Sequence, residues 1–150
     1  MRPLIRNATK FDIPALLDML YLYKDETPLQ FLESAFEESY LTSLLSEIIA
    51  GKGVALIAET DKPIGMLIAA IAPSKWQPSK FLLMELAYWV NHEQRGGTAG
   101  YRLIKEYQAQ GLELKNNKRI ENFLISKMST SPDLKFNKFG FTKLEEYWVQ

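Results

Sequence analysis

The chain has 150 residues, the size of one common domain, and its 18 basic side chains balance 18 acidic ones to give zero formal net charge. Proteins that bind duplexes through phosphates normally have a basic excess, so nucleic acid is not expected as the main partner. The absence of cysteine and the single histidine exclude disulfides, cysteine nucleophiles and thiolate or histidine-rich metal sites, and we expect no metal. No apolar run approaches the roughly 20 residues that span a membrane. Met1–Asn7 lacks the apolar stretch of a signal peptide, so we expect a cytoplasmic protein without membrane contact.

Apolar spacing and turn signals divide the chain into ten expected elements. Ile13, Leu16 and Leu20 recur at helical spacing, whereas the stretches after Val54 are typical of buried strands. In chain order, the expected elements are a strand at Arg2–Asn7, a helix from Asp12 to about Lys24, a helix from Thr27 to Gly51 with a break near Ser39–Thr42, strands at Val54–Glu59, Ile64–Ala72 and Phe81–Val90, a helix to about Gly111, a strand at Ile120–Met128, a short helix at Pro132–Phe139 and a last strand at Phe141–Val149.

The order β-α-α-β-β-β-α-β-α-β predicts one mixed α/β (α+β) domain over residues 1–150. Consecutive strands joined by short turns favour mostly antiparallel pairing, with helices flanking the sheet. No boundary in the sequence indicates a second domain.

The loop between the strand ending at Val90 and the next helix is rich in small residues. The segment His92–Gly100 reads HEQRGGTAG. Small side chains let another group approach the backbone, and the helix start offers N–H groups without internal partners at the positive end of its dipole. These features predict an anion site suited to a pyrophosphate, to which Arg95 adds a charge-assisted hydrogen bond. The loop matches neither the P-loop nor the dinucleotide fingerprint.

This loop and the order of elements resemble the GNAT superfamily of acetyl-CoA-dependent N-acetyltransferases, whose pyrophosphate loop reads Gln/Arg-x-x-Gly-x-Gly/Ala. Two registers fit. Gln94 with Gly97 and Ala99 satisfies the pattern literally. The register that we prefer matches more positions but puts threonine where glycine is usual. Its matching residues are Val90, Arg95, Gly96 and Gly100.

The resemblance extends to the tail, where Phe136–Phe141 reads FNKFGF and is similar to the family's Tyr-x-x-x-Gly-Phe. It implies a GNAT-like, mostly antiparallel central sheet, acetyl-CoA as the acyl donor and CoA as the product. The implied cofactor contacts fall on the strand end, the loop and two tail positions. These residues are Trp89, Val90, Gln94, Arg95, Gly96, Gly97, Thr98, Ala99, Gly100, Ser129 and Phe136.

The family often deprotonates the amine with a carboxylate on the strand before the loop. Glu85 is the only carboxylate within Phe81–Val90, and it is the expected base; the alternative is a residue that reaches solvent or a lysine. Plain alternation places Glu85 on the side of Ala87 and Trp89, opposite Val90. The bulge that is usual in this strand of the family would change that facing.

Phe136 stands where the family usually has a tyrosine as general acid. A phenyl ring donates no proton, so water or another tyrosine must protonate the thiolate. The candidates are Tyr88, Tyr101 and Tyr147, of which Tyr88 lies on the same strand as Glu85.

The acceptor pocket is expected between the first two helices and the strand ends. Tyr21, Tyr23 and Glu26 lie at that helix junction, and Trp76 in the Pro73–Pro78 loop is a further candidate wall. Taken singly, each of these residues also fits a solvated turn or the edge of the core.

The sequence therefore predicts an N-acetyltransferase that moves an acetyl group directly to an amine of a small molecule, peptide or protein. The alternative is a catalytically weak or inactive GNAT-fold module that binds CoA or a partner as a sensor or interaction protein, which Phe136 favours. A single closing strand after Gly140 would leave a sheet edge that a homodimer could cover.

Overall fold

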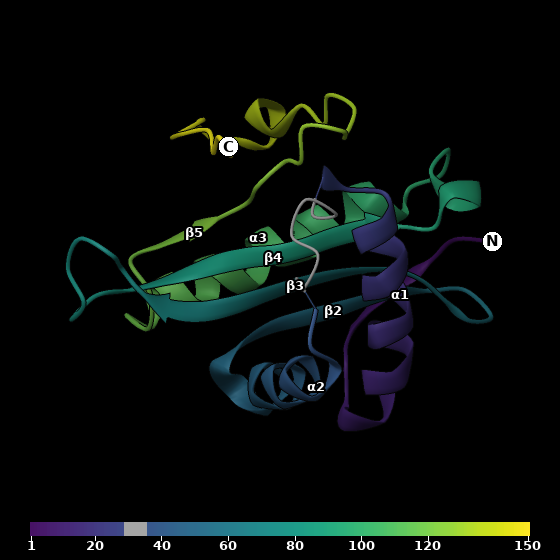
Figure 1. Ribbon diagram of the computed structural model, residues 1–150, viewed down its shortest axis with the longest axis horizontal. Coiled ribbons are helices and arrows are strands. Elements are labelled where there is room, and N and C mark those ends of the chain that lie inside the picture. The colour runs from purple at the N-terminus through teal and green to yellow at the C-terminus, as the bar shows by residue number, and fades with distance from the viewer. Residues whose placement is uncertain (29–35) are drawn as a thin grey trace.

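The computed structural model describes residues 1–28 and 36–150 of the chain. Figure 1 shows a curved sheet with helices on both of its faces. Its five strands are, in spatial order, β1 (Leu4–Asn7), β2 (Gly53–Glu59), β3 (Pro63–Pro73), β4 (Phe81–Val90) and β5 (Asn122–Leu124). The helices are α1 (Ile13–Asp25), α2 (Glu38–Glu47) and α3 (Ala99–Asn116). The expected mixed, mostly antiparallel fold class is confirmed.

The strand pairing changes from antiparallel to parallel at the last pair of strands. The first four strands pair antiparallel in chain order, as short turns between them require. The chain then crosses through α3, so β5 pairs parallel to β4, and only over Leu82–Met84 with Asn122–Leu124. A short parallel pair at one edge leaves most of β4 without a partner on that side.

Two apolar clusters hold the layers together. On one face α1 and α2 cover the sheet, with Leu16 and Leu45 packed against Ile57 and Ile68. On the other face α3 buries Leu103 against the sheet. Figure 1 shows α3 behind the sheet, α1 in front of it and α2 below it in this view. The fully apolar strands thus fill two cores, which explains why their sequences show little alternation.

The second helix differs from the expectation. A helix beginning at Thr27 is not formed: Thr27 lies in a bend, and Glu37 has an extended backbone immediately before α2. Part of the expected segment, residues 29–35, lies outside the described residues. The helix then continues from α2 into a π-helical turn at Ile48–Lys52, where Gly51 has a φ of 122°, and ends beside β2.

The third helix is longer than the sequence indicates. Gly111 was expected to end it, but α3 continues to Asn116. A Cβ atom on Gly111 would lie 2.7 Å from the Phe123 ring. This glycine therefore makes room for β5 and does not terminate the helix.

The tail is the part of the fold that the sequence predicts least well. The expected helix at 132–139 is a single 3₁₀ turn, Phe136–Phe139, because Lys135 before it and Gly140 after it both have left-handed backbones. The expected strand at 141–149 is not formed, and Trp148 is 87% exposed. A strand needs a ladder partner, and none of the described strands pairs with these residues.

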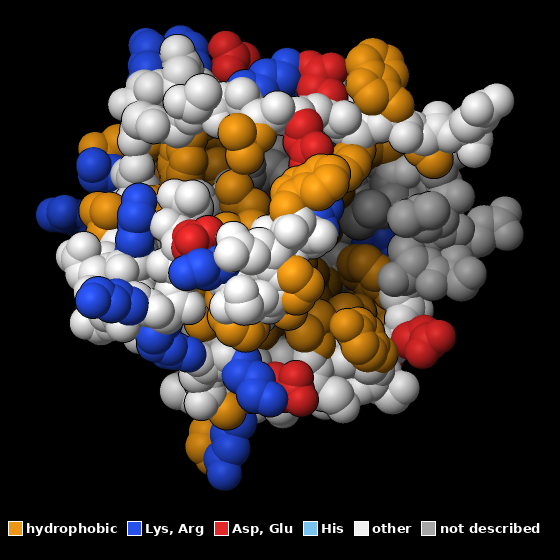
Figure 2. Space-filling model, turned by 90° about the vertical axis from the view of Figure 1, so that its left-hand side faces the viewer, with side chains coloured by type: hydrophobic (Ala, Val, Ile, Leu, Met, Phe, Trp, Pro, Cys, Tyr) orange, Lys and Arg blue, Asp and Glu red, His pale blue; other side chains and the backbone are white. Residues whose placement is uncertain are grey.

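The surface carries both signs of charge. Figure 2 shows the end of the molecule that bears the turn between β3 and β4; hydrophobic side chains gather towards the middle of this face, and most charged side chains surround them. Within the described ranges, no helix has the length and apolar character that crossing a membrane demands.

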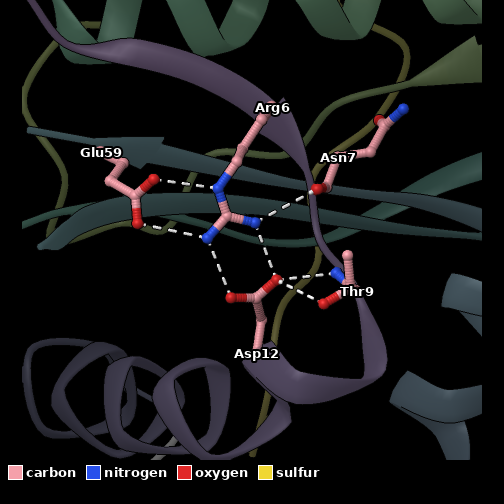
Figure 3. A network of polar contacts seen from close by, with 5 residues as sticks. All are labelled: Arg6, Asn7, Thr9, Asp12 and Glu59. Atoms are coloured by element: carbon pink, nitrogen blue, oxygen red, sulfur yellow. Dashed lines mark hydrogen bonds and ion pairs between the residues drawn. The ribbon is translucent and has the colours of Figure 1, made fainter.

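A charged network fastens the start of the chain to the sheet (Figure 3). The Arg6 guanidinium donates two hydrogen bonds to Asp12, at 2.8 and 2.9 Å, and two to Glu59 on β2, at 3.0 and 3.2 Å. The Asp12 carboxylate also accepts a bond from the Thr9 backbone at 2.7 Å. Asp12 precedes α1 as expected, but its carboxylate binds Arg6 and Thr9 and does not cap that helix.

Candidate functional site

A fork opens where β4 and β5 separate. Tyr107 from α3 reaches between the strands, and its hydroxyl donates to the carbonyl of Leu124 and, at 3.4 Å, to that of Leu83. Beyond Met84, β3 is the only described strand that continues to pair with β4. One edge of the second half of β4 therefore has no ladder partner, and an extended ligand could pair with it.

Glu85 lies at the base of this fork. One of its carboxylate oxygens accepts hydrogen bonds from Ser126, at 2.8 Å from the backbone N–H and 2.9 Å from the hydroxyl. The residue is only 9% exposed. Burial raises the pKa of Glu85 to about 7, although both bonds from Ser126 oppose the rise. A carboxyl group with this pKa exchanges a proton near neutral pH, which suits a general base.

A β-bulge sets the direction of Glu85. Ala69 lies opposite Glu85 and Ile68 lies opposite Ala87, so Leu86 is the extra residue on β4. Cross-strand partners share a face of the sheet. Ala69 belongs to the cluster under α3, whereas Ile68 and Ala87 belong to the cluster under α1 and α2. Plain alternation, which put Glu85 and Ala87 on one side, is therefore wrong, and the bulge is the reason.

Tyr88 extends from β4 to the first turn of α3. A Cβ atom on Gly100 would lie 2.7 Å from the Tyr88 hydroxyl oxygen. Burial and the nearby Glu85 charge raise the pKa of Tyr88 to about 12, so the phenol keeps its proton at neutral pH. Gly100 thus leaves room for the Tyr88 side chain.

The exposed part of the glycine-bearing loop is shorter than its sequence indicates. Ala99 belongs to the core under α3, whereas residues 96–98 are exposed. A Cβ atom on Gly96 would meet nothing within 4 Å, and one on Gly97 only the Gln94 carbonyl at 3.6 Å. The Thr98 side chain forms no cap bond to the helix that follows. Bare backbone and uncapped first-turn N–H groups therefore meet at the start of α3, as an anion site requires.

Arg95 points back into the protein. Its Nε donates to the Val90 carbonyl at 2.8 Å, and its guanidinium forms an ion pair with Glu26 at the end of α1. The same Glu26 oxygen accepts a bond from the Trp89 indole at 3.1 Å. Glu26, a candidate for the acceptor pocket, ties the end of α1 to the end of β4 and the loop.

The segment after β5 turns towards α1. Met128 packs against the cluster under α1 and α2, and the Thr130 hydroxyl donates to the Glu26 carbonyl at 3.1 Å. Ser129 between them is exposed. Phe136 packs on Phe141, with ring centroids 6.1 Å apart. This segment therefore crosses the open end of the fork and meets the end of α1.

The remaining candidate residues for the acceptor pocket do not lie together. Tyr23 is buried and lines a small cavity between the helices and the sheet, whereas Tyr21 packs on Phe36 with ring centroids 5.9 Å apart. Trp76 is 86% exposed in the turn between β3 and β4, at the opposite end of β4 from Trp89. The structure thus brings Tyr23 to the sheet beside β4 and does not bring Trp76 there.

The other two tyrosines considered as proton donors lie on the surface. Tyr101 packs on Phe139 with ring centroids 5.5 Å apart and remains exposed. Tyr147 is exposed in the tail. Tyr88 is the one of the three that interacts electrostatically with Glu85.

Two residues of the fork were not identified from the sequence. Ser126 fixes the Glu85 carboxylate, and Tyr107 joins the strands just before they separate. The signal for each was weak: a serine directly after the apolar residues Phe123–Ile125, and a tyrosine on the buried face of a helix. The buried Tyr107 hydroxyl needed a hydrogen-bond partner, but the sequence does not say which one.

Comparison with known proteins places the fold. No known family profile matches the chain, and no curated protein matches its sequence. Among solved structures, a predicted acetyltransferase with acetyl-CoA from Clostridium acetobutylicum is 15% identical, with a TM-score of 0.69 over 99% of this chain and 95% of that one. An aminoglycoside acetyltransferase from an uncultured soil metagenomic sample, in complex with sisomicin, is 17% identical, with a TM-score of 0.65 over 99% and 93%.

A transcriptional regulator from Bacillus halodurans is 17% identical, with a TM-score of 0.69 over 99% of this chain and 98% of that one. Likeness at this level of identity establishes the fold. The fold that the sequence resemblance implies is therefore confirmed over nearly the whole chain.

Proposed function

We propose that this chain, which has the fold of GNAT-type acetyltransferases, is one domain over residues 1–150 that transfers the acetyl group of acetyl-CoA directly to an amine. The observation that carries the proposal is the fork between β4 and β5. It holds a buried carboxylate at its base, and β4 leads from it into a loop of bare backbone at the start of α3.

The residues around the fork fit acetyl-CoA. The open backbone of Gly96 and Gly97 and the first-turn N–H groups of α3 would hold the pyrophosphate. The unpaired edge of β4 at Tyr88–Val90 would hold the amides of the pantetheine arm. Arg95 and Ser129 would lie beside the bound cofactor. Arg95 would not be a direct phosphate ligand, because its guanidinium is paired with Glu26. Acetyl-CoA supplies the acetyl group as a reactive thioester.

Glu85 accepts the proton of the acceptor amine in this mechanism. The amine nitrogen forms the new C–N bond to the acetyl carbon, the thioester C–S bond breaks, and its electron pair leaves with sulfur. One amine proton passes to Glu85, and the departing thiolate takes a proton from Tyr88 or from water. Two observations support these roles: the pKa of Glu85 near neutrality and the protonated Tyr88 phenol beside it.

Thermal unfolding in the presence of CoA and acetyl-CoA tests the cofactor part of the proposal. A ligand that binds only the folded chain raises the midpoint, by an amount that grows with its concentration. Gly96→Val should fold normally, since its Cβ meets nothing, but should lose most of the shift. Asn117→Val, exposed at the far end of α3, is the matched control. No shift of the wild-type midpoint at saturating CoA would refute the proposal.

A second candidate function is a GNAT-fold module that binds CoA or a partner without efficient turnover. Phe136 favours it, because the ring packs on Phe141 and offers no proton where the family usually has tyrosine. A protein named as a transcriptional regulator shares this fold. CoA binding without thiol release on any amine would select this function.

We also propose that the chain forms a homodimer through the exposed edge of β5. β5 ends the sheet of the described chain, and apolar side chains of the tail beside it, including Leu144 and Trp148, are exposed. Light scattering should give twice the monomer mass at micromolar concentration; a monomer would exclude the proposal.

A further inference from the structure

The free edge of β4 ends in a carbonyl that the protein itself occupies. In an antiparallel ladder, hydrogen-bonded residue pairs alternate with pairs whose backbone groups point away from the partner strand. The Asn91 N–H donates to Ile64 on β3 at 2.7 Å, so the preceding residue, Val90, presents its N–H and carbonyl to the opposite side. The Nε atom of Arg95 donates to that carbonyl at 2.8 Å. Arg95 therefore lies across the end of the free edge.

The rest of this edge remains for a ligand. The alternation that turns Val90 outward also turns Tyr88 outward, and the pairing with β5 ends earlier in β4, at Met84. The N–H and carbonyl of Tyr88 and the N–H of Val90 thus face the fork, whereas the Val90 carbonyl is taken. Such an edge donates to carbonyl groups of a ligand at both residues but accepts an N–H only at Tyr88. The two amides of a pantetheine arm can supply these partners.

Glu26, at the end of α1, holds the Arg95 guanidinium in this place. The two side chains form an ion pair, and the same Glu26 oxygen accepts a hydrogen bond from the Trp89 indole at 3.1 Å. Trp89 is buried, so its ring is a fixed point beside the edge. The Glu26 carbonyl accepts a bond from the Thr130 hydroxyl at 3.1 Å, which ties α1 to the segment after β5. Glu26 therefore connects Arg95 to both sides of the fork.

The loop that would hold the pyrophosphate has backbone bonds of its own. The Gln94 N–H donates to the Asn91 carbonyl at 2.8 Å, and the Gly97 N–H donates to the Gln94 carbonyl at 3.2 Å. Neither of these turn bonds involves the Arg95 side chain. The one contact of the guanidinium with a side chain of the loop, the His92 ring at 3.5 Å, is its longest. The guanidinium thus acts on the edge of β4 more than on the loop backbone.

We propose that Glu26 and Arg95 are positioning residues for the acyl donor. By closing the Val90 carbonyl and holding the end of β4, they direct the pantetheine arm of acetyl-CoA to Tyr88 and to the Val90 N–H. The inference rests on the proposed acetyl transfer and assigns both side chains to the arm instead of the pyrophosphate. Arg95 acts through the strand and touches no phosphate.

Two ligands separate the arm from the phosphates. CoA carries both, whereas adenosine 3′-phosphate 5′-diphosphate carries the phosphates without the arm. Glu26→Gln keeps an oxygen for the Trp89 indole but loses the ion pair, and Arg95→Gln loses the ion pair from the other side. In calorimetric titrations, the dissociation constant of CoA divided by that of the nucleotide should rise about fivefold in each variant, roughly the loss of one hydrogen bond.

The two variants change the net charge in opposite directions, so a rise of this ratio in both cannot come from charge. Glu93→Gln removes an exposed carboxylate from the same loop, and it is the matched control that should leave the ratio unchanged. A general loosening of the fold would weaken both ligands alike. If Glu26→Gln tightens CoA, or if Arg95→Gln weakens both ligands by the same factor, Arg95 is a phosphate ligand and the inference is overturned.

Failure of the proposed function would look different. If CoA does not bind the wild type, acetyl transfer fails; if either ligand does not bind, amide hydrogen exchange decides the positioning of the edge. The N–H groups of Trp89 and Asn91 face β3. They should exchange about fivefold faster in Glu26→Gln and Arg95→Gln than in Glu93→Gln, because the end of β4 opens more readily without the ion pair. Equal exchange in the three variants would overturn the inference.

Discussion

The Glu85 carboxylate accepts two hydrogen bonds from Ser126, at 2.8 and 2.9 Å, at the point where β4 and β5 separate. These bonds take the place of the strand pairing that ends one residue earlier, at Met84. Because they favour the charged carboxylate while burial favours the neutral acid, they moderate the pKa of the group proposed as the base.

Ser126→Ala removes the hydroxyl bond and keeps the backbone bond. The pKa of Glu85 should rise further, so the acidic limb of kcat/KM for acetyl transfer should move about half a unit to one unit towards higher pH. Ser46→Ala, exposed on α2, is the control. Coincident pH profiles for Ser126→Ala and the wild type would remove Ser126 from this role.

Glu85→Gln should change how stability depends on pH. The pKa of Glu85 is about 7 in the folded chain, whereas its ordinary value is 4.5, so between these values the folded state binds a proton that the unfolded state has lost. The free energy of unfolding should therefore fall as pH rises from 4.5 to 7. In the variant this fall should be smaller by about 1–3 kcal/mol, measured by urea unfolding at pH 4.5 and 8. Glu113→Gln on the exposed side of α3 should retain the wild-type fall, and a retained fall in Glu85→Gln would contradict the account.

Asp12→Asn should lower the free energy of unfolding at neutral pH but not in strong acid. Hydrogen bonds from Arg6 lower the pKa of Asp12 from 3.8 to about 2, so its stabilising contribution is complete above pH 4 and disappears as pH falls towards 2. The variant should lose about 1–2 kcal/mol at pH 7 and nothing relative to the wild type near pH 2. Asp18→Asn on the exposed side of α1 serves as the comparison in the same urea titrations. A loss that is independent of pH would point to packing instead of charge.

Gly100→Ala should destabilise the chain through Tyr88. The new Cβ would lie 2.7 Å from the tyrosine hydroxyl oxygen, and the overcrowding should cost about 1–3 kcal/mol. Because Tyr88→Phe removes that oxygen, the double variant should recover much of the loss, which a double-mutant cycle by urea unfolding measures. Strict additivity of the two losses would show that Tyr88 is not the reason for the glycine.

The sequence predicted best the elements that packing alone determines. The bounds of β4 are those expected, Phe81–Val90, since a continuous apolar strand is bounded by turn residues on both sides. The helix from Ile13 was also recognised, as its buried residues recur every three or four positions.

Long-range contacts were beyond the reach of sequence patterns. Gly111 and Gly100 have the appearance of a helix end and a ligand-binding glycine, but each accommodates one aromatic ring from another element. Arg95 has the appearance of a phosphate ligand, but Glu26 from a distant helix binds it. Likewise, only the register with β3 shows that Leu86 is the extra residue that turns Glu85 to the other face.

The most direct test of the account is amine-dependent release of the CoA thiol from acetyl-CoA by the wild-type chain and by Glu85→Gln. The account predicts release by the wild type with at least one primary amine. It also predicts a rate at least about 100-fold lower in the variant, with the same acetyl-CoA dissociation constant, because a positioned general base contributes about 10²–10⁴. Equal rates in the two proteins, or no release by the wild type with any amine at saturating acetyl-CoA, would contradict it.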